Sequence, residues 1–224
     1  MTLKKATLFI ILILLIDQVS KLYIKTHFII GERVIVFDWF EIAFVENDGM
    51  AWGTKLSDFA SFISDRVAKL CLTLFRIVAI FGIGYWLVKS VKKKAATSLL
   101  IAIVLIFAGA LGNILDSVFY GVFFSSSVHE LATFLPEAGG YESVFHGNVV
   151  DMLHFPMFSG VYPEWLPFLG GQTFSFFDPV FNVADMAIST GIGVLIVFNK
   201  QAFPKDEERG SVENAPLNQT LENE

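Results

Sequence analysis

Four stretches of this chain are long and apolar enough to cross a lipid bilayer, and they limit the possible fold more than any other feature. They cover about residues 5–24, 70–88, 95–120 and 180–199, and a spanning helix needs about 20 mainly apolar residues. Only 17% of the residues are charged, against about 25% in soluble domains. The sequence predicts an all-α integral membrane protein with four transmembrane helices.

The positions of the basic residues predict how these helices are oriented. Lys4 and Lys5 open the first stretch, four lysines lie within residues 89–94, and residues 121–179 contain no Lys or Arg. Basic residues in short loops stay on the cytoplasmic side. We therefore expect both termini in the cytoplasm and two outer loops, residues 25–69 and 121–179.

Residues 1–200 are expected to form a single membrane domain. Residues 201–224 are polar, acidic and without hydrophobic periodicity, which is typical of a disordered segment. They are predicted to be a disordered cytoplasmic tail.

The first outer loop carries an alternating pattern. Its apolar residues occur at every second position, as in a strand with one apolar face: Val34, Val36, Phe40, Ile42 and Phe44. This predicts a small extracytoplasmic β-sheet (cradle). Asn47-Asp48-Gly49 is typical of a tight turn, and residues 57–69 have the spacing of a short interfacial helix.

The second outer loop is rich in aromatic residues, including Trp165 and Phe168. Aromatic rings are favoured at the membrane interface. We expect this loop to rest on the interface and to cover whatever lies beneath it.

Several polar residues lie within or beside the apolar stretches. Asp17 and Lys21 are spaced i, i+4, Asn113 and Asp116 are one turn apart, and Asp185 follows Asn182. An aspartate at the centre of a membrane helix costs about 2.5 to 3.5 kcal/mol on insertion scales, so such residues tend to mark function.

Two carboxyls from different segments can share one proton, because like charges in a low dielectric cannot both ionise cheaply. The ionised carboxyl can then take a proton from water while the protonated one polarises a carbonyl. This is the chemistry of an aspartic peptidase, and it needs no metal or other cofactor.

Five motifs carry a family resemblance. They are DQVSK at residues 17–21, ENDGMAWG at 46–53, AGALGNILD at 108–116, VVD at 149–151 and FNVAD at 181–185. In this order, they resemble the motif set of lipoprotein signal peptidase, also called signal peptidase II. The similarity covers about residues 5–200.

The resemblance implies an aspartic endopeptidase of the bacterial inner membrane. Such an enzyme removes the signal peptide of a prolipoprotein, cutting before the diacylglyceryl-modified cysteine. It implies prolipoproteins with a lipobox and membrane lipid as partners, and globomycin-type inhibitors that occupy the site.

The resemblance also assigns roles to individual residues. Asp151 and Asp185 would be the catalytic pair. The other positions fall into two groups: Asn47, Gly49, Asn113 and Asn182 as substrate-binding or dyad-supporting residues, and Asp17, Lys21 and Asp116 as structural residues around them.

The chain departs from the family pattern at Ser117. In the family, an Arg usually follows the aspartate that corresponds to Asp116. Asp116 would then lack a charge partner, which Arg76 is expected to supply from the second stretch. Arg76 is equally compatible with pairing to Asp17 or with snorkelling to the interface. Residues 124–145 and 154–178 resemble insertions.

Other interpretations remain open on the sequence. Each aspartate can be a helix cap or part of an ion pair, and membrane carboxylates also relay ions in a small ion- or proton-coupled transporter. A scaffold would explain only the long aromatic loop. His129, His146 and His154 do not have the spacing of a zinc site, and the single cysteine, Cys71, is expected to be buried.

Overall fold

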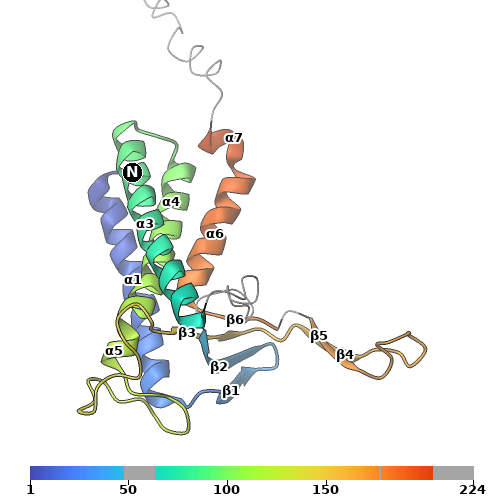
Figure 1. Cartoon of the computed structure of the whole chain (residues 1–224). Coiled ribbons are helices and arrows are strands. Elements are labelled where there is room, and N and C mark those ends of the chain that lie inside the picture. Colours follow the sequence, from blue (N-terminus) through green and yellow to red (C-terminus); the bar gives the residue numbers. More distant parts are fainter. Residues whose placement is uncertain (48–63, 177, 204–224) are drawn as a thin grey trace, which may run out of the picture.

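The computed structural model describes residues 1–47, 64–176 and 178–203. Its long helices lie alongside one another, with a β-sheet at one end of them (Figure 1). They are α1 (Leu3–His27), α3 (Asp65–Lys92), α4 (Thr97–Leu115) and α6 (Val183–Val197). Gly49, the turn at 48–49, most of the interfacial helix at 57–69 and the tail from residue 204 lie outside the described residues.

Three helical segments within this part of the chain are long and apolar enough to cross a membrane: α1, α3 and residues Thr97–Phe123. The third joins α4 to a π-helix, η2 (Asp116–Tyr120), and a short helix, α5 (Gly121–Phe123). The predicted spans at 5–24, 70–88 and 95–120 therefore form helices. Each helical segment is longer than the apolar window that predicted it.

The fourth apolar stretch begins differently from the prediction. Val180 and Phe181 form a strand, β6, and the helix starts only at Val183. The reason is local, because Asn182 and Asp185 form a capping box in which each side chain accepts the other's backbone N–H. Asp185 thus lies in the first turn of α6, close to the N-terminal end of the helix.

Small residues bring α4 and α6 close together. A Cβ on Gly109 would lie 2.2 Å from the Ala184 carbonyl oxygen, and one on Gly112 would lie 3.3 Å from Ala184 Cβ. Such glycines let membrane helices approach at backbone distance. The start of α6 is therefore held directly against the C-terminal half of α4.

The sheet has the order β1-β2-β3-β6, and every pair is antiparallel. Its strands are β1 (Arg33–Phe37), β2 (Phe40–Asn47), β3 (Val149–His154) and β6 (Val180–Phe181). The predicted sheet of the first loop is confirmed, and β3 and β6 add the second loop to it.

The alternation predicted one buried apolar face along both strands of the first loop, but the structure buries that face on β2 and leaves it exposed on β1. Phe44 is fully buried, but Val34 and Val36 on the edge strand β1 remain 43% and 41% exposed. The buried part packs on α1 and the end of the third span, where Ile24, Tyr120 and Phe124 complete the cluster. Residues of β2 and β3 therefore pack against the helices, whereas the edge strand β1 is exposed.

A separate two-stranded ribbon, β4 (Phe158–Val161) with β5 (Thr173–Phe176), projects sideways from the sheet end of the molecule (Figure 1). Its tip exposes Trp165 and Phe168.

Cys71 was expected to be buried. It lies on α3 with its side chain exposed, so it faces away from the neighbouring helices.

Candidate active site

Asp151 and Asp185 come from different elements and are linked by one residue between them. Asp151 is the third residue of β3, and Asp185 lies in the first turn of α6. The Asn182 side-chain amide donates to Asp151 Oδ1 at 2.7 Å, and the Asn182 backbone N–H donates to Asp185 Oδ2 at 3.2 Å. The residue that caps α6 thereby holds both carboxyls.

Each carboxyl accepts a further hydrogen bond from an asparagine. Asn47, at the end of β2, donates to Asp151 Oδ2 at 3.1 Å, and Asn113 of α4 donates to Asp185 Oδ1 at 2.8 Å. The Asn182 amide also reaches Asn113 Oδ1 at 3.2 Å. The structure therefore brings together five residues that the sequence assigned to one site.

Beneath this group lies a buried cluster of three charges. The Lys21 ammonium is 3.0 Å from Asp17 Oδ2 and 2.8 Å from Asp116 Oδ2, and all three side chains are almost fully buried. The expected i, i+4 pair of Asp17 and Lys21 is present. Lys21 also supplies the charge partner that Asp116 was expected to lack.

The two acids of this cluster also bind backbone on either side. Asp17 Oδ1 accepts the Ala184 N–H at 2.9 Å, next to Asp185 in α6. Asp116 Oδ2 accepts the Val150 N–H at 3.3 Å, next to Asp151 in β3. The cluster thus fixes the backbone on which each candidate carboxyl stands.

Burial and charge change the acidity of Asp151. Desolvation is the largest cause and the negative charge of Asp185 adds to it, so the pKa of Asp151 rises to about 7. Hydrogen bonds from Asn47 and Asn182, which favour the ionised form, only partly offset this rise. The protonated form of Asp151 is therefore favoured well above the ordinary pKa of an aspartate.

Arg76 does not serve Asp116 as the sequence suggested. Its charge acts on Asp185, and Asp116 is bound by Lys21 and by the Gln18 amide at 2.9 Å. Ser117, which stands in the usual place of Arg, donates to the Asn113 carbonyl oxygen at 3.0 Å. Lys21 of α1, at 2.8 Å, therefore fills the place at Asp116 that Arg76 was expected to fill.

Sequence reasoning missed a second buried ion pair beside the site. Lys25 pairs with Glu46, whose Oε2 accepts the Asn148 amide at 2.9 Å. Tyr141 covers Lys25, with its ring centroid 4.5 Å from the ammonium, and burial raises the pKa of its phenol. The spacing of Asp17, Lys21 and Lys25, four residues apart, was the signal that all three share one helix face.

The histidines of the second loop do not converge. His154 binds Glu41 at 3.1 Å and Asp178 at 3.2 Å, at the far end of β3 from Asp151. Within the described ranges, no group of three His, Cys, Asp or Glu side chains is placed to hold a metal ion.

The fold and this arrangement of carboxyls define a multi-pass membrane protein with a polar, acid-containing site at one end of its helices. A similar fold occurs in a solved structure described as a bacterial membrane enzyme. It has a TM-score of 0.57 and 23% sequence identity, and the match covers 90% of this chain and 96% of that one.

The sequence comparisons identify the family. The model for signal peptidase (SPase) II matches residues 9–200. A lipoprotein signal peptidase of Porphyromonas gingivalis is 49% identical over 189 residues, which cover 84% of this chain and 79% of the relative. Another, from Amoebophilus asiaticus, is 34% identical, over 86% of this chain and 75% of the relative.

The chain belongs to the signal peptidase II family. It is a peptidase, and its apolar helices agree with a protein that crosses the membrane several times.

Proposed function

We propose that this peptidase removes the signal peptide from diacylglyceryl-modified prolipoproteins, cutting before the lipidated cysteine with water activated by Asp151 and Asp185. The observation that carries the proposal is the link through Asn182, which holds two carboxyls in one network (2.7 and 3.2 Å). The names of the relatives, lipoprotein signal peptidases, support the substrate class.

The roles of the two acids follow from their surroundings. Asp185 accepts hydrogen bonds from Asn113 and from the Asn182 N–H, and the positive charge of Arg76 acts on it. Asp151, whose pKa is raised to about 7, keeps its proton, so Asp185 is the base and Asp151 the acid.

The reaction then balances without a further group. Asp185 takes a proton from water as the water oxygen bonds to the scissile carbonyl carbon, and Asp151 gives its proton to the carbonyl oxygen. The tetrahedral intermediate collapses, the C–N bond breaks, and the amine nitrogen takes the proton held by Asp185. The hydroxyl proton returns to Asp151 as the carboxyl group of the signal peptide forms.

The arrangement of the helices supports a fourth crossing and the predicted orientation. The N-terminus and the lysine-rich turn between α3 and α4 lie at the end of the bundle opposite the sheet (Figure 1). With these in the cytoplasm of a bacterial inner membrane, the carboxyls meet substrate at the outer face. The 15 residues of α6 span about 22 Å, so α6 crosses with help from β6 and from α7 (Asn199–Ala202).

The sheet and ribbon then take their places around the substrate. Strands β2 and β3 carry Asn47 and Asp151 on adjoining edges of the site, which supports a cradle for an extended peptide. The β4–β5 ribbon, with Trp165 and Phe168 exposed at its tip, rests on the outer face of the inner membrane. A globomycin-type inhibitor would occupy the space beside the two carboxyls.

A cleavage assay tests the proposal. Purified wild type is mixed with a diacylglyceryl-modified prolipoprotein, in the presence of a chelator, and compared with Asp151→Asn and Asp185→Asn. We expect wild type to cut and each variant to lose at least about a thousandfold in rate, as when an acid–base pair is broken.

Asp38→Asn is the matched control, because Asp38 is an exposed acid in the turn between β1 and β2. It should cut at the wild-type rate. Normal cleavage by folded Asp151→Asn or Asp185→Asn would show that the pair is not catalytic. Equal cleavage of precursor without the diacylglyceryl group would refute the substrate class.

A further inference from the structure

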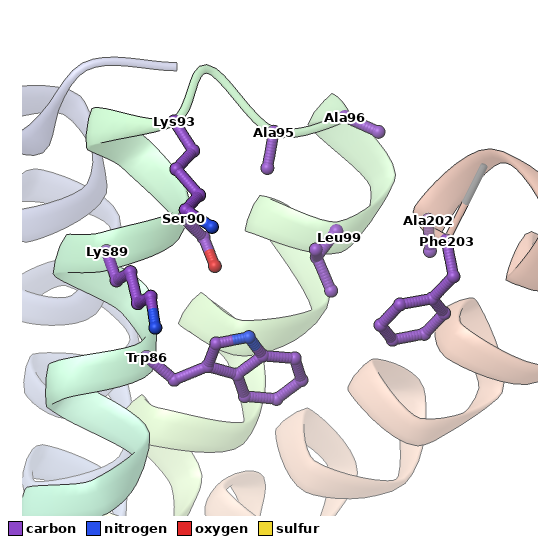
Figure 2. A pocket seen from close by; sticks show the side chains of 9 residues that line it. All are labelled: Trp86, Lys89, Ser90, Lys93, Ala95, Ala96, Leu99, Ala202 and Phe203. Carbon is purple, nitrogen blue, oxygen red and sulfur yellow. The ribbon is translucent and has the colours of Figure 1, made fainter. Parts of the chain in front are cut away.

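A cavity lies at the end of the helices farthest from the two carboxyls, and the proposed reaction makes no use of it. It has a volume of about 350 Å³, which is within the range of small-ligand sites. It lies between the end of α3, the start of α4 and the end of α7, as Figure 2 shows from close by.

One side of the cavity is made of hydrogen-bond donors. Lys89, Ser90 and Lys93, at the end of α3, line it together with Trp86. No acidic side chain lines the cavity, and neither lysine forms an ion pair within the described parts of the chain. Two lysine ammoniums without a neighbouring carboxylate favour a ligand that carries negative charge.

Ser90 is the most specific of these donors. It is only 5% exposed, and its hydroxyl lines the cavity. The Ser90 hydroxyl is not one of the fully buried polar atoms that lack a partner, a group that within the described ranges contains Ser98 Oγ. Because Ser90 lines the cavity, its hydroxyl can donate a hydrogen bond to an oxygen of a bound anion.

The opposite side of the cavity is apolar. Leu99 of α4 and Ala202 are buried, and Phe203 faces Trp86 across the opening (Figure 2). A free inorganic anion gains nothing from such a wall, because desolvating it there brings no compensating hydrogen bond. A molecule that joins a negative headgroup to acyl chains fits both sides.

From these observations we propose that the cavity between α3, α4 and α7 binds an anionic phospholipid, with the phosphate at Lys89, Ser90 and Lys93 and the first part of an acyl chain along Leu99 and Phe203. Its position at the end of apolar helices puts the headgroup at the membrane interface. Basic pockets between membrane helices are suited to such headgroups.

Lipid titrations of the purified full chain in maltoside micelles test this. Dioctanoyl phosphatidylglycerol is compared with dioctanoyl phosphatidylcholine and with inorganic phosphate. We expect saturable binding of the phosphatidylglycerol only. Lys89→Gln with Lys93→Gln should weaken it about 30-fold, at about 1 kcal/mol for each lysine.

Lys92→Gln with Lys94→Gln is the matched control, since these lysines lie in the same turn but do not line the cavity. It should leave the affinity within about threefold, as expected of exposed charges. Ser90→Ala, with no change of charge, should weaken binding severalfold and gives a second test if the lysine variant does not fold.

Three results would overturn the proposal. Equal binding of phosphatidylcholine would show that the lysines do not select a charge, and equal binding of inorganic phosphate would show that the apolar wall has no part. An equal loss in the two lysine pairs would show a general surface effect. Each variant is first checked for the wild-type unfolding temperature in zwitterionic lipid.

Discussion

The Lys21 ammonium donates a hydrogen bond to Asn113 Oδ1 at 2.9 Å, and Asn113 donates its amide to Asp185 Oδ1 at 2.8 Å. Lys21 thereby sets which way the Asn113 amide faces, since its oxygen is taken by a cation. The buried charge cluster and the candidate catalytic acids are thus parts of one hydrogen-bond network.

Lys21→Met should be strongly destabilising. The substitution leaves Asp17 and Asp116 as buried carboxylates without their cation, and breaking one partner of a buried ion pair costs about 3 to 5 kcal/mol. The measurement is the unfolding midpoint in detergent. Lys5→Met, at an exposed position of the same helix, should leave it unchanged.

Neutralising the two acids should reverse part of this loss. Adding Asp17→Asn and Asp116→Asn to Lys21→Met removes the uncompensated charge, so we expect a higher midpoint than in the single variant. A single variant as stable as wild type would mean that the cluster does not hold the helices together.

Asp151→Asn should stabilise the fold at alkaline pH. The folded pKa, about 7, lies above the ordinary 3.8, so the contribution of this carboxyl is present below about pH 4 and is lost as the pH rises through 7. The gain of the variant over wild type should grow from pH 4 to pH 8, by up to about 4 kcal/mol at about 1.4 kcal/mol per pKa unit.

Unfolding midpoints across this pH range provide the measurement. Asp38→Asn, an exposed acid, should follow wild type at every pH. A constant difference between Asp151→Asn and wild type would show that burial does not raise the pKa of Asp151 in the folded protein.

Asn47→Ala should move the alkaline limb of the activity profile to higher pH. The Asn47 amide favours the ionised form of Asp151, and losing a hydrogen bond to a charged group raises the pKa by about one unit. If Asp151 is the acid, kcat/KM falls as that proton is lost. Asn199→Ala, in α7 beyond the far end of α6, should leave the limb in place.

Gly109→Ala should disturb the site without touching a polar group. The added methyl would lie 2.2 Å from the Ala184 carbonyl oxygen and 2.8 Å from Ile188 Cγ1, so α6 must move. We expect a loss of about 1 to 3 kcal/mol and reduced cleavage. Gly193→Ala, with nothing within 4 Å, should lose neither.

The ribbon at β4 and β5 should meet lipid through its tip. Trp165 is 78% exposed in the protein, and an interfacial position favours such a ring. With Trp39, Trp52 and Trp86 changed to Phe, Trp165 in vesicles should emit at shorter wavelength than in water. Lipids brominated near the headgroup should quench it. Unquenched emission at the wavelength of exposed tryptophan would place the ribbon away from the membrane.

Local sequence patterns predict much of this architecture. Long apolar windows predict helices because a backbone in lipid must satisfy its own hydrogen bonds, and alternation at Phe40, Ile42 and Phe44 predicts a strand. The motif resemblance indicated which aspartates to compare. Where one local signal opposed another, as at Asn182, the cap prevailed over the apolar run and shortened the fourth helix.

The sequence by itself determined the membrane class, the strands of the first loop and the residue types of the site, because each depends on neighbours a few positions apart. Only the tertiary structure decided the partners. Lys21 rather than Arg76 neutralises Asp116, and Lys25 pairs with Glu46. Asn182 joins Asp151 to Asp185. Such pairings depend on the direction and depth of side chains from different elements, which no spacing along one chain specifies.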